Sequence, residues 1–203
     1  MIRTQIFFAD LSDLKSALGS HNEEIKKQIL SSLGYGENDA DSESDKWRQG
    51  VSDLIDEANV STAASQIAFN RLPKVLHIPT FSEFADWEDA VYWDLAQALE
   101  EKGVDKRLVG YLKMLYSGRR IDQTDQVLER YASLTETDSL NNFADIPRHS
   151  YLTNGETQEL IRLLKETPVE DLDEELQEFI TEELKPALAK SVELGKGLLF
   201  IVE

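Results

Sequence analysis

The side chains best suited to acid–base chemistry near neutral pH are three histidines, His21, His77 and His149. A nucleophile–base pair needs a Ser, Thr or Cys beside a histidine, and none of the three lies in a G-x-S-x-G setting. His149 has the most suggestive neighbours, because Arg148 precedes it and Tyr151 follows it just before a predicted helix start. Arg148, His149 and Tyr151 therefore define one candidate ligand or catalytic site. An ordinary surface or partly buried histidine is the simpler interpretation for each, so no catalytic residue is assigned.

Carboxylates concentrate in two segments that contain no basic residue. The first, residues 34–45, reads GYGENDADSESD and offers almost nothing apolar to offset the entropy of ordering, so a mobile acidic loop is predicted near 34–46. The second spans residues 170–183 and includes a predicted helix start. Carboxylate pairs can act as general acid and base, but a solvated acidic surface is the preferred interpretation and a protein-docking surface is the functional alternative. The residues assigned to that surface are Glu37, Asp39, Asp41, Glu43, Glu170, Asp171, Asp173, Glu174, Glu175 and Glu178.

Motifs for metals, cofactors and phosphates are not recognised. The chain has no cysteine and no H-E-x-x-H, which leaves no sulfur ligand set and no zincin pattern. A calcium loop counted from Asp39 would need glycine at its sixth position and glutamate at its twelfth, but Ser44 and Gly50 stand there. The stretch Gly195-Lys196-Gly197 precedes a predicted strand rather than a helix, the wrong order for a P-loop. No metal and no cofactor is therefore predicted.

The charge balance excludes some classes of partner. With 39 acidic and 21 basic residues, the formal net charge of -18 would repel nucleic-acid phosphates and anionic lipid. A basic protein is the partner that such a surface favours. Asp10 interrupts the apolar N-terminal stretch too early for a signal peptide. Polar residues also interrupt the charge-free stretch 58–70, so no membrane span is expected and a cytoplasmic location is predicted.

The elements that would position these residues are mostly helical. The β-branched and aromatic run near the N-terminus, ending at Phe8, and the apolar run Leu198 to Val202 are predicted to be strands lying side by side in one small sheet. Residues 75–78 and 149–152 are candidates for further strands in that sheet. The predicted fold is α+β, a single domain over residues 1–203 with helices packed on a small mixed sheet that includes both terminal strands.

Capping signals and prolines predict where several helices begin and end. Asp105 is expected to cap a helix that Gly118 stops, and Thr153 with Glu156 forms a capping box at the start of another. A further helix is predicted over residues 82–101. Pro73 should break the helix before it, and Pro186 should kink or restart the helix that ends near Gly195.

Three stretches resemble uncharacterised bacterial families of the YfbM-like type. They are residues 7–19 (FFADLSDLKSALG), the capped segment 151–164, and residues 188–202 with the ending GKGLLFIV. Those families similarly begin with a strand and helix and end with a helix running into an apolar strand. The resemblance implies an α+β fold and a bacterial origin, and it carries no activity or catalytic residue over to this chain.

Two functional hypotheses follow. The preferred one is a non-enzymatic, acidic protein-interaction module, for example an immunity or antitoxin-like inhibitor that presents both acidic segments to a basic partner. The alternative is a small-molecule-binding domain or enzyme with its site near Arg148, His149 and Tyr151.

Overall fold

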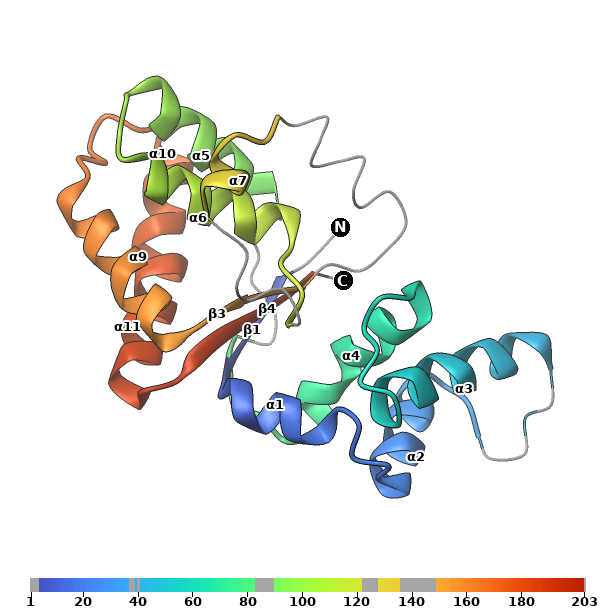
Figure 1. The fold of residues 1–203 in the computed structure, drawn as a ribbon. Coiled ribbons are helices and arrows are strands. Elements are labelled where there is room, and N and C mark those ends of the chain that lie inside the picture. Colours follow the sequence, from blue (N-terminus) through green and yellow to red (C-terminus); the bar gives the residue numbers. More distant parts are fainter. Residues whose placement is uncertain are drawn as a thin grey trace. The chain divides into compact units, whose positions relative to one another are not determined.

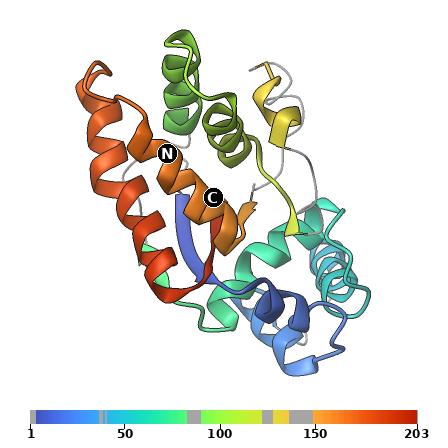
Figure 2. The ribbon, with the colours of Figure 1, turned by 60° about the vertical axis from the view of Figure 1, so that its left-hand side comes forward.

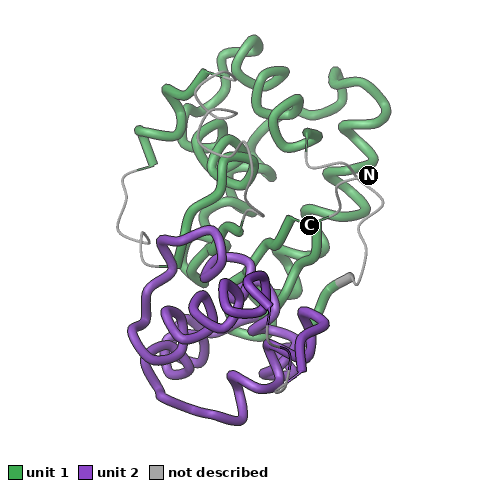
Figure 3. The backbone as a smooth tube through the Cα atoms, turned by 90° about the vertical axis from the view of Figure 1, so that its right-hand side faces the viewer, with its two compact units in different colours: residues 1–8, 80–203 green, residues 9–79 purple. Residues whose placement is uncertain are grey.

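The computed structural model describes residues 4–36, 39, 41–82, 90–121, 128–135 and 149–202. The chain, which was expected to form a single domain, divides into two compact units (Figure 3). Unit 1 comprises residues 1–8 and 80–203, and unit 2 comprises residues 9–79. Each unit is described by itself.

Unit 1 is built on a four-stranded sheet with the strand order β2-β1-β4-β3. Its strands are β1 (Thr4–Ala9), β2 (Thr80–Ser82), β3 (His149–Leu152) and β4 (Gly197–Val202). Strand β2 pairs antiparallel with β1, and β3 pairs antiparallel with β4. The sheet was predicted to be mixed, but neither of these two strand pairs is parallel. Every residue of the two central strands is buried, which explains why the C-terminal run is continuously apolar. The predicted α+β fold with both terminal strands in one sheet is confirmed.

The helices of unit 1 supply most of its core. They are α5 (Ala90–Glu101), α6 (Lys106–Ser117), α7 (Leu128–Ala132), α9 (Asn154–Glu166), α10 (Glu174–Glu178), the π-helical segment η2 (Phe179–Leu184) and α11 (Lys185–Leu194). Helices α9 and α11 pack against each other and both contact β4 (Figures 1 and 2). Tyr92 of α5 links the helices to the sheet, because its ring meets Phe179 edge-on at 5.0 Å and Phe200 at 6.0 Å.

The expected kink or restart at Pro186 takes the form of a π-helical segment. Helix α10 passes into η2 and then α11, which begins at Lys185 with Pro186 in its first turn. The Lys185 amide donates to the Ile180 carbonyl five residues back, so the wider turn directly precedes the proline. The proline's missing N–H falls at the start of α11, where it costs little.

The described part of unit 2 contains four helices, α1 (Leu11–Ala17), α2 (Glu23–Ser32), α3 (Ser42–Ile55) and α4 (Ala63–Val75). Helices α3 and α4 cross closely at Gly50, where an added Cβ would lie 2.5 Å from the Cβ of Ala64. A glycine is therefore required at this crossing for the two backbones to approach.

Three predictions in unit 2 were wrong, and they concern the extent of the acidic loop, a strand at residues 75–78 and a helix break at Pro73. The acidic loop expected near 34–46 is shorter, because α3 begins at Ser42 behind a capping box formed by Asp41 and Ser44. Residues 75–78 form no strand; α4 runs through Pro73 to Val75, and the strand of this region is β2 at residues 80–82. Pro73 lies in the last turn, where it removes a single helical hydrogen bond and is itself buried with Leu72, so the helix tolerates it.

In the described part of the chain, no helix has the length and apolar character to cross a membrane.

Candidate functional site

The 170–178 acidic segment of unit 1 brings most of the predicted interaction residues together. Glu170 and Asp171 lie in the turn before α10, Asp173 is its N-cap, and Glu174, Glu175 and Glu178 lie on the helix. All six side chains are exposed. Among the described residues none of these carboxylates takes part in an ion pair.

Backbone contacts hold this segment in a defined conformation. The Gln177 side-chain amide donates to the carbonyls of Glu170 at 3.1 Å and Leu172 at 2.7 Å. Lys102 donates to the Asp171 carbonyl at 3.3 Å, and Leu172 is buried beneath the turn. These hydrogen bonds to backbone carbonyls hold the turn in place, while its carboxylates are exposed to solvent.

Asp173 has a structural task within this segment. Its Oδ1 atom accepts a hydrogen bond of 2.9 Å from the Leu176 amide and caps α10. Glu174 and Glu175 occupy the first turn, where negative charge interacts favourably with the helix dipole. Substitutions that probe recognition are therefore cleaner at Glu170, Asp171 and Glu178.

The first acidic segment offers less to a partner. Glu37 lies outside the described residues. Asp39 accepts a hydrogen bond of 2.5 Å from the Gly36 amide, and Asp41 accepts one of 2.7 Å from the Ser44 amide, so both carboxylates are used to shape the chain. Glu43 is exposed in the first turn of α3. The two acidic segments belong to different units.

The alternative site near His149 is only partly described. Arg148 lies outside the described residues. His149 and Tyr151 are 3% and 2% exposed on β3, two positions apart and hence on the same face of the strand. Tyr151 packs over Gly197, since its hydroxyl lies 2.4 Å from where a Cβ of Gly197 would stand. The two side chains are thus part of the packing of the sheet.

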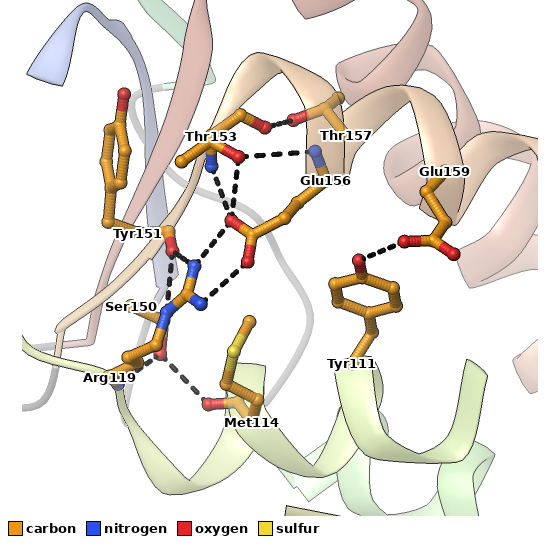
Figure 4. Close-up of polar contacts among 9 residues, drawn as sticks. All are labelled: Tyr111, Met114, Arg119, Ser150, Tyr151, Thr153, Glu156, Thr157 and Glu159. Carbon is orange, nitrogen blue, oxygen red and sulfur yellow. Dashed lines mark hydrogen bonds and ion pairs between the residues drawn. The ribbon is translucent and has the colours of Figure 1, made fainter. Parts of the chain in front are cut away.

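An ion pair between buried Arg119 and half-buried Glu156 was not predicted (Figure 4). Arg119 is 1% exposed, and its Nη1 and Nη2 atoms donate to Oε1 and Oε2 of Glu156, both at 2.7 Å. Its Nε atom donates to the Tyr151 carbonyl at 3.1 Å, and its Nη2 atom donates to the same oxygen. Glu156 also accepts the Thr153 amide at 2.8 Å, which completes the predicted capping box of α9.

This network joins three pieces of unit 1. The Arg119 amide donates to the carbonyl of His149 and to the hydroxyl of Ser150, both at 3.0 Å, and that hydroxyl donates to the Met114 carbonyl at 3.0 Å. The segment after α6 is thereby tied to β3 and to the start of α9. Because the charges satisfy each other and the arginine is buried, the arrangement positions these elements and offers no group for catalysis.

Burial and charge act in opposite directions on Glu156. Burial by itself raises the pKa of this carboxyl, but the hydrogen bonds and charge of Arg119, together with Thr153, outweigh it and hold the pKa below its ordinary 4.5. Nearby, the Tyr111 hydroxyl donates to Glu159 Oε2 at 2.7 Å, and burial raises the pKa of Tyr111 to about 12. Tyr111 therefore remains a neutral donor at physiological pH.

The described residues contain no group of three or more His, Asp or Glu side chains that could hold a metal ion. Comparison with protein-family models, curated proteins and solved structures gave no match. The resemblance to YfbM-like families therefore stays a prediction.

Proposed function

We propose that this protein is a non-enzymatic interaction module of the bacterial cytoplasm that binds a basic protein partner through the 170–178 acidic segment. The observation that supports it most is the set of exposed carboxylates that form no ion pair with a described residue and are carried on a braced turn and helix. An immunity or antitoxin-like inhibitor is the kind of module that fits this surface.

Physical chemistry links such a surface to recognition. A fixed cluster of like charges steers a partner of opposite charge and raises the association rate. Bracing matters because a surface that is already ordered loses less conformational entropy on binding. The bonds from Gln177 and Lys102 to the turn supply that order here.

The small-molecule alternative has less support. His149 and Tyr151 are buried within the sheet of unit 1, so the two side chains serve its packing.

The test is affinity capture from a lysate of the native host with the tagged full chain, at about 0.15 M salt, where exposed charges more than about 8 Å apart are already screened. The probe variant carries Glu170→Lys, Asp171→Lys and Glu178→Lys, which leaves the Asp173 cap and the first turn of α10 intact. The matched control carries Asp13→Lys, Glu57→Lys and Glu129→Lys, three exposed residues away from this segment. Both variants have the same net charge.

A single stoichiometric basic protein, retained by the wild type and the control but lost from the probe variant, is the expected result. Purified, this partner should bind with an affinity that falls steeply as salt is raised. Equal loss of the partner from both variants would assign the capture to net charge alone. Capture of no defined basic protein would overturn the proposal.

A further inference from the structure

Asn154 is followed by Gly155, and this is the one Asn-Gly pair in the sequence. In such a pair the backbone nitrogen of the second residue can attack the side-chain carboxamide of the first and form a cyclic imide. Glycine favours this reaction because it has no Cβ to obstruct the approach and its backbone has unusual conformational freedom. The pair lies in the first turn of α9, which begins at Asn154.

The surroundings of Gly155 suit such an attack. Gly155 is exposed, and an added Cβ would have no described atom within 4 Å, so neighbouring groups do not crowd the main chain there. Its amide lies in the first turn, where backbone N–H groups have no partner within the helix. The next amide, that of Glu156, donates to the Thr153 hydroxyl at 3.2 Å. The Gly155 nitrogen is therefore not held by the hydrogen bonds of the helix.

The Asn154 carboxamide, in contrast, is held by two hydrogen bonds. Its Nδ2 atom donates to the Lys196 carbonyl at 2.9 Å, and its Oδ1 atom accepts from Gln158 Nε2 at 2.7 Å. The Lys196 carbonyl also accepts from the hydroxyl of buried Ser191 at 2.5 Å, which fixes the turn between α11 and β4. The carboxamide thus ties the start of α9 to that turn. While both bonds are in place, it is not free to rotate toward the Gly155 nitrogen.

We propose that Asn154 is a site of spontaneous deamidation, and that opening of the first turn of α9 controls the reaction. When the turn opens, a bond forms between the Gly155 nitrogen and Asn154 Cγ. The bond between Cγ and Nδ2 breaks, and ammonia leaves with the proton of the Gly155 amide. Water then adds to one of the two carbonyls of the imide and gives aspartate or isoaspartate.

The modification removes a contact of the fold. A carboxylate at position 154 has no N–H to donate, so the bond to the Lys196 carbonyl is lost. Isoaspartate also adds a methylene to the main chain within the first turn. Because the ammonia is lost, each converted chain keeps a lasting record that this turn has opened. The inference concerns α9 and does not depend on the acidic segment of the proposed function.

The test measures conversion in the full chain by tryptic peptide mapping and mass spectrometry, in folded samples and in concentrated urea at the same mildly alkaline pH. Cleavage after Arg148 and Arg162 gives a peptide in which Asn154 is the one asparagine. Gln158→Ala removes a hydrogen bond to the carboxamide, and the control Gln28→Ala removes a bond of the same spacing on α2. Circular dichroism confirms that both variants are folded.

We expect Asn154 to convert in urea and at least about tenfold more slowly in the folded chain, since slow modification follows the population of the open form. Gln158→Ala should speed conversion of the folded chain about two- to tenfold, as loss of one hydrogen bond does, and Gln28→Ala should leave it unchanged. Gly155→Ala should slow conversion in urea, where the fold no longer contributes. Equal rates in folded and unfolded chains, no conversion in urea, equal rates for the two glutamine variants, or no effect of Gly155→Ala would each overturn the proposal.

Discussion

Among the described residues, Arg119 is the largest side chain that the fold buries completely, and its charge has to be matched inside unit 1. Glu156 supplies that match through two hydrogen bonds of 2.7 Å. Glu156→Gln would leave the buried guanidinium without its counter-charge, so we expect the free energy of unfolding to fall by about 3 kcal/mol, as for other broken buried pairs. Urea denaturation measures this change.

Glu159→Gln is the matched control, three residues further along α9. Glu159 accepts from Tyr111 and pairs with Arg107, whose side chain is 53% exposed, so its loss should cost less than about 1 kcal/mol. Equal costs for the two substitutions would contradict the assignment of Arg119 as a buried, charge-dependent centre.

The same pair predicts a pH dependence of stability. The folded-state pKa of Glu156 lies below its ordinary 4.5, so the carboxylate contributes stability that is fully present above pH 4.5 and is lost as the pH falls through the lowered pKa. The wild type should therefore lose more unfolding free energy on acidification below pH 4.5 than Glu156→Gln does. Denaturation series at matched pH values measure the difference, and parallel curves would refute the prediction.

For single residues, the sequence predicts only those contacts of the Arg119 network whose members lie close together along the chain. Thr153 and Glu156 are three residues apart and could be predicted as a capping box, which the structure confirms. Arg119 lies 37 positions from Glu156, and no local pattern reports such a distance. The sequence shows only that Arg119 directly follows the predicted helix stop at Gly118. This position does not predict that Arg119 is buried, because its burial depends on tertiary packing.

At the scale of elements, two helical glycines should respond oppositely to alanine. A Cβ at Gly50 would meet Ala64 at 2.5 Å, so Gly50→Ala should destabilise the protein by about 1–3 kcal/mol through overpacking of α3 against α4. Gly155 in the first turn of α9 has nothing within 4 Å of an added Cβ, and Gly155→Ala should stabilise by about 0.5–1 kcal/mol. Thermal unfolding of both variants tests the pair; a neutral Gly50→Ala would show that the helices can separate.

Element ends that depend on neighbouring residues were predicted well, and those that depend on packing were not. Asp105 caps α6 as expected, with its carboxylate accepting the Arg107 amide at 2.8 Å. Pro73 was expected to end its helix, but the buried apolar face of α4 carries the helix through it. The predicted helix over residues 82–101 is described only from Ala90, and residues 83–89 lie outside the described part.

For the candidate interaction site, the sequence identified the carboxylates but did not show which of them accept hydrogen bonds from the backbone. Exposure of the 170–178 segment follows from its composition, since buried carboxylates need partners that the segment lacks. The capping roles of Asp39, Asp41 and Asp173 depend on backbone conformation, so they became visible only in the structure.

At the scale of the whole molecule, unit 2 interrupts an antiparallel strand pair. Strands β1 and β2 pair directly, yet residues 10–79 lie between them along the chain. Two such strands can be joined by a turn of two residues. Replacing residues 10–79 by a short Asn-Gly turn should therefore leave unit 1 folded, because the described core cluster built around α5, α6, α9 and α11 comes from unit 1 alone.

Near-ultraviolet circular dichroism and cooperative urea unfolding measure this outcome. Buried Trp93 packs against Tyr116 at 5.3 Å and should give the shortened chain a defined aromatic signal. A compact chain without that signal and without a cooperative transition would show that unit 1 needs unit 2 to fold.

The centre of the sheet also has a consequence for the rate of folding. Strands β1 and β4 are neighbours although they come from residues 4–9 and 197–202. The equilibrium cost of closing so long a chain segment grows only slowly, by about 0.6 kcal/mol per doubling of length. The search for such a distant partner nevertheless slows folding. Helix pairs such as α5 with α6 can form from local contacts first, and the two strands that hold the sheet together should meet late.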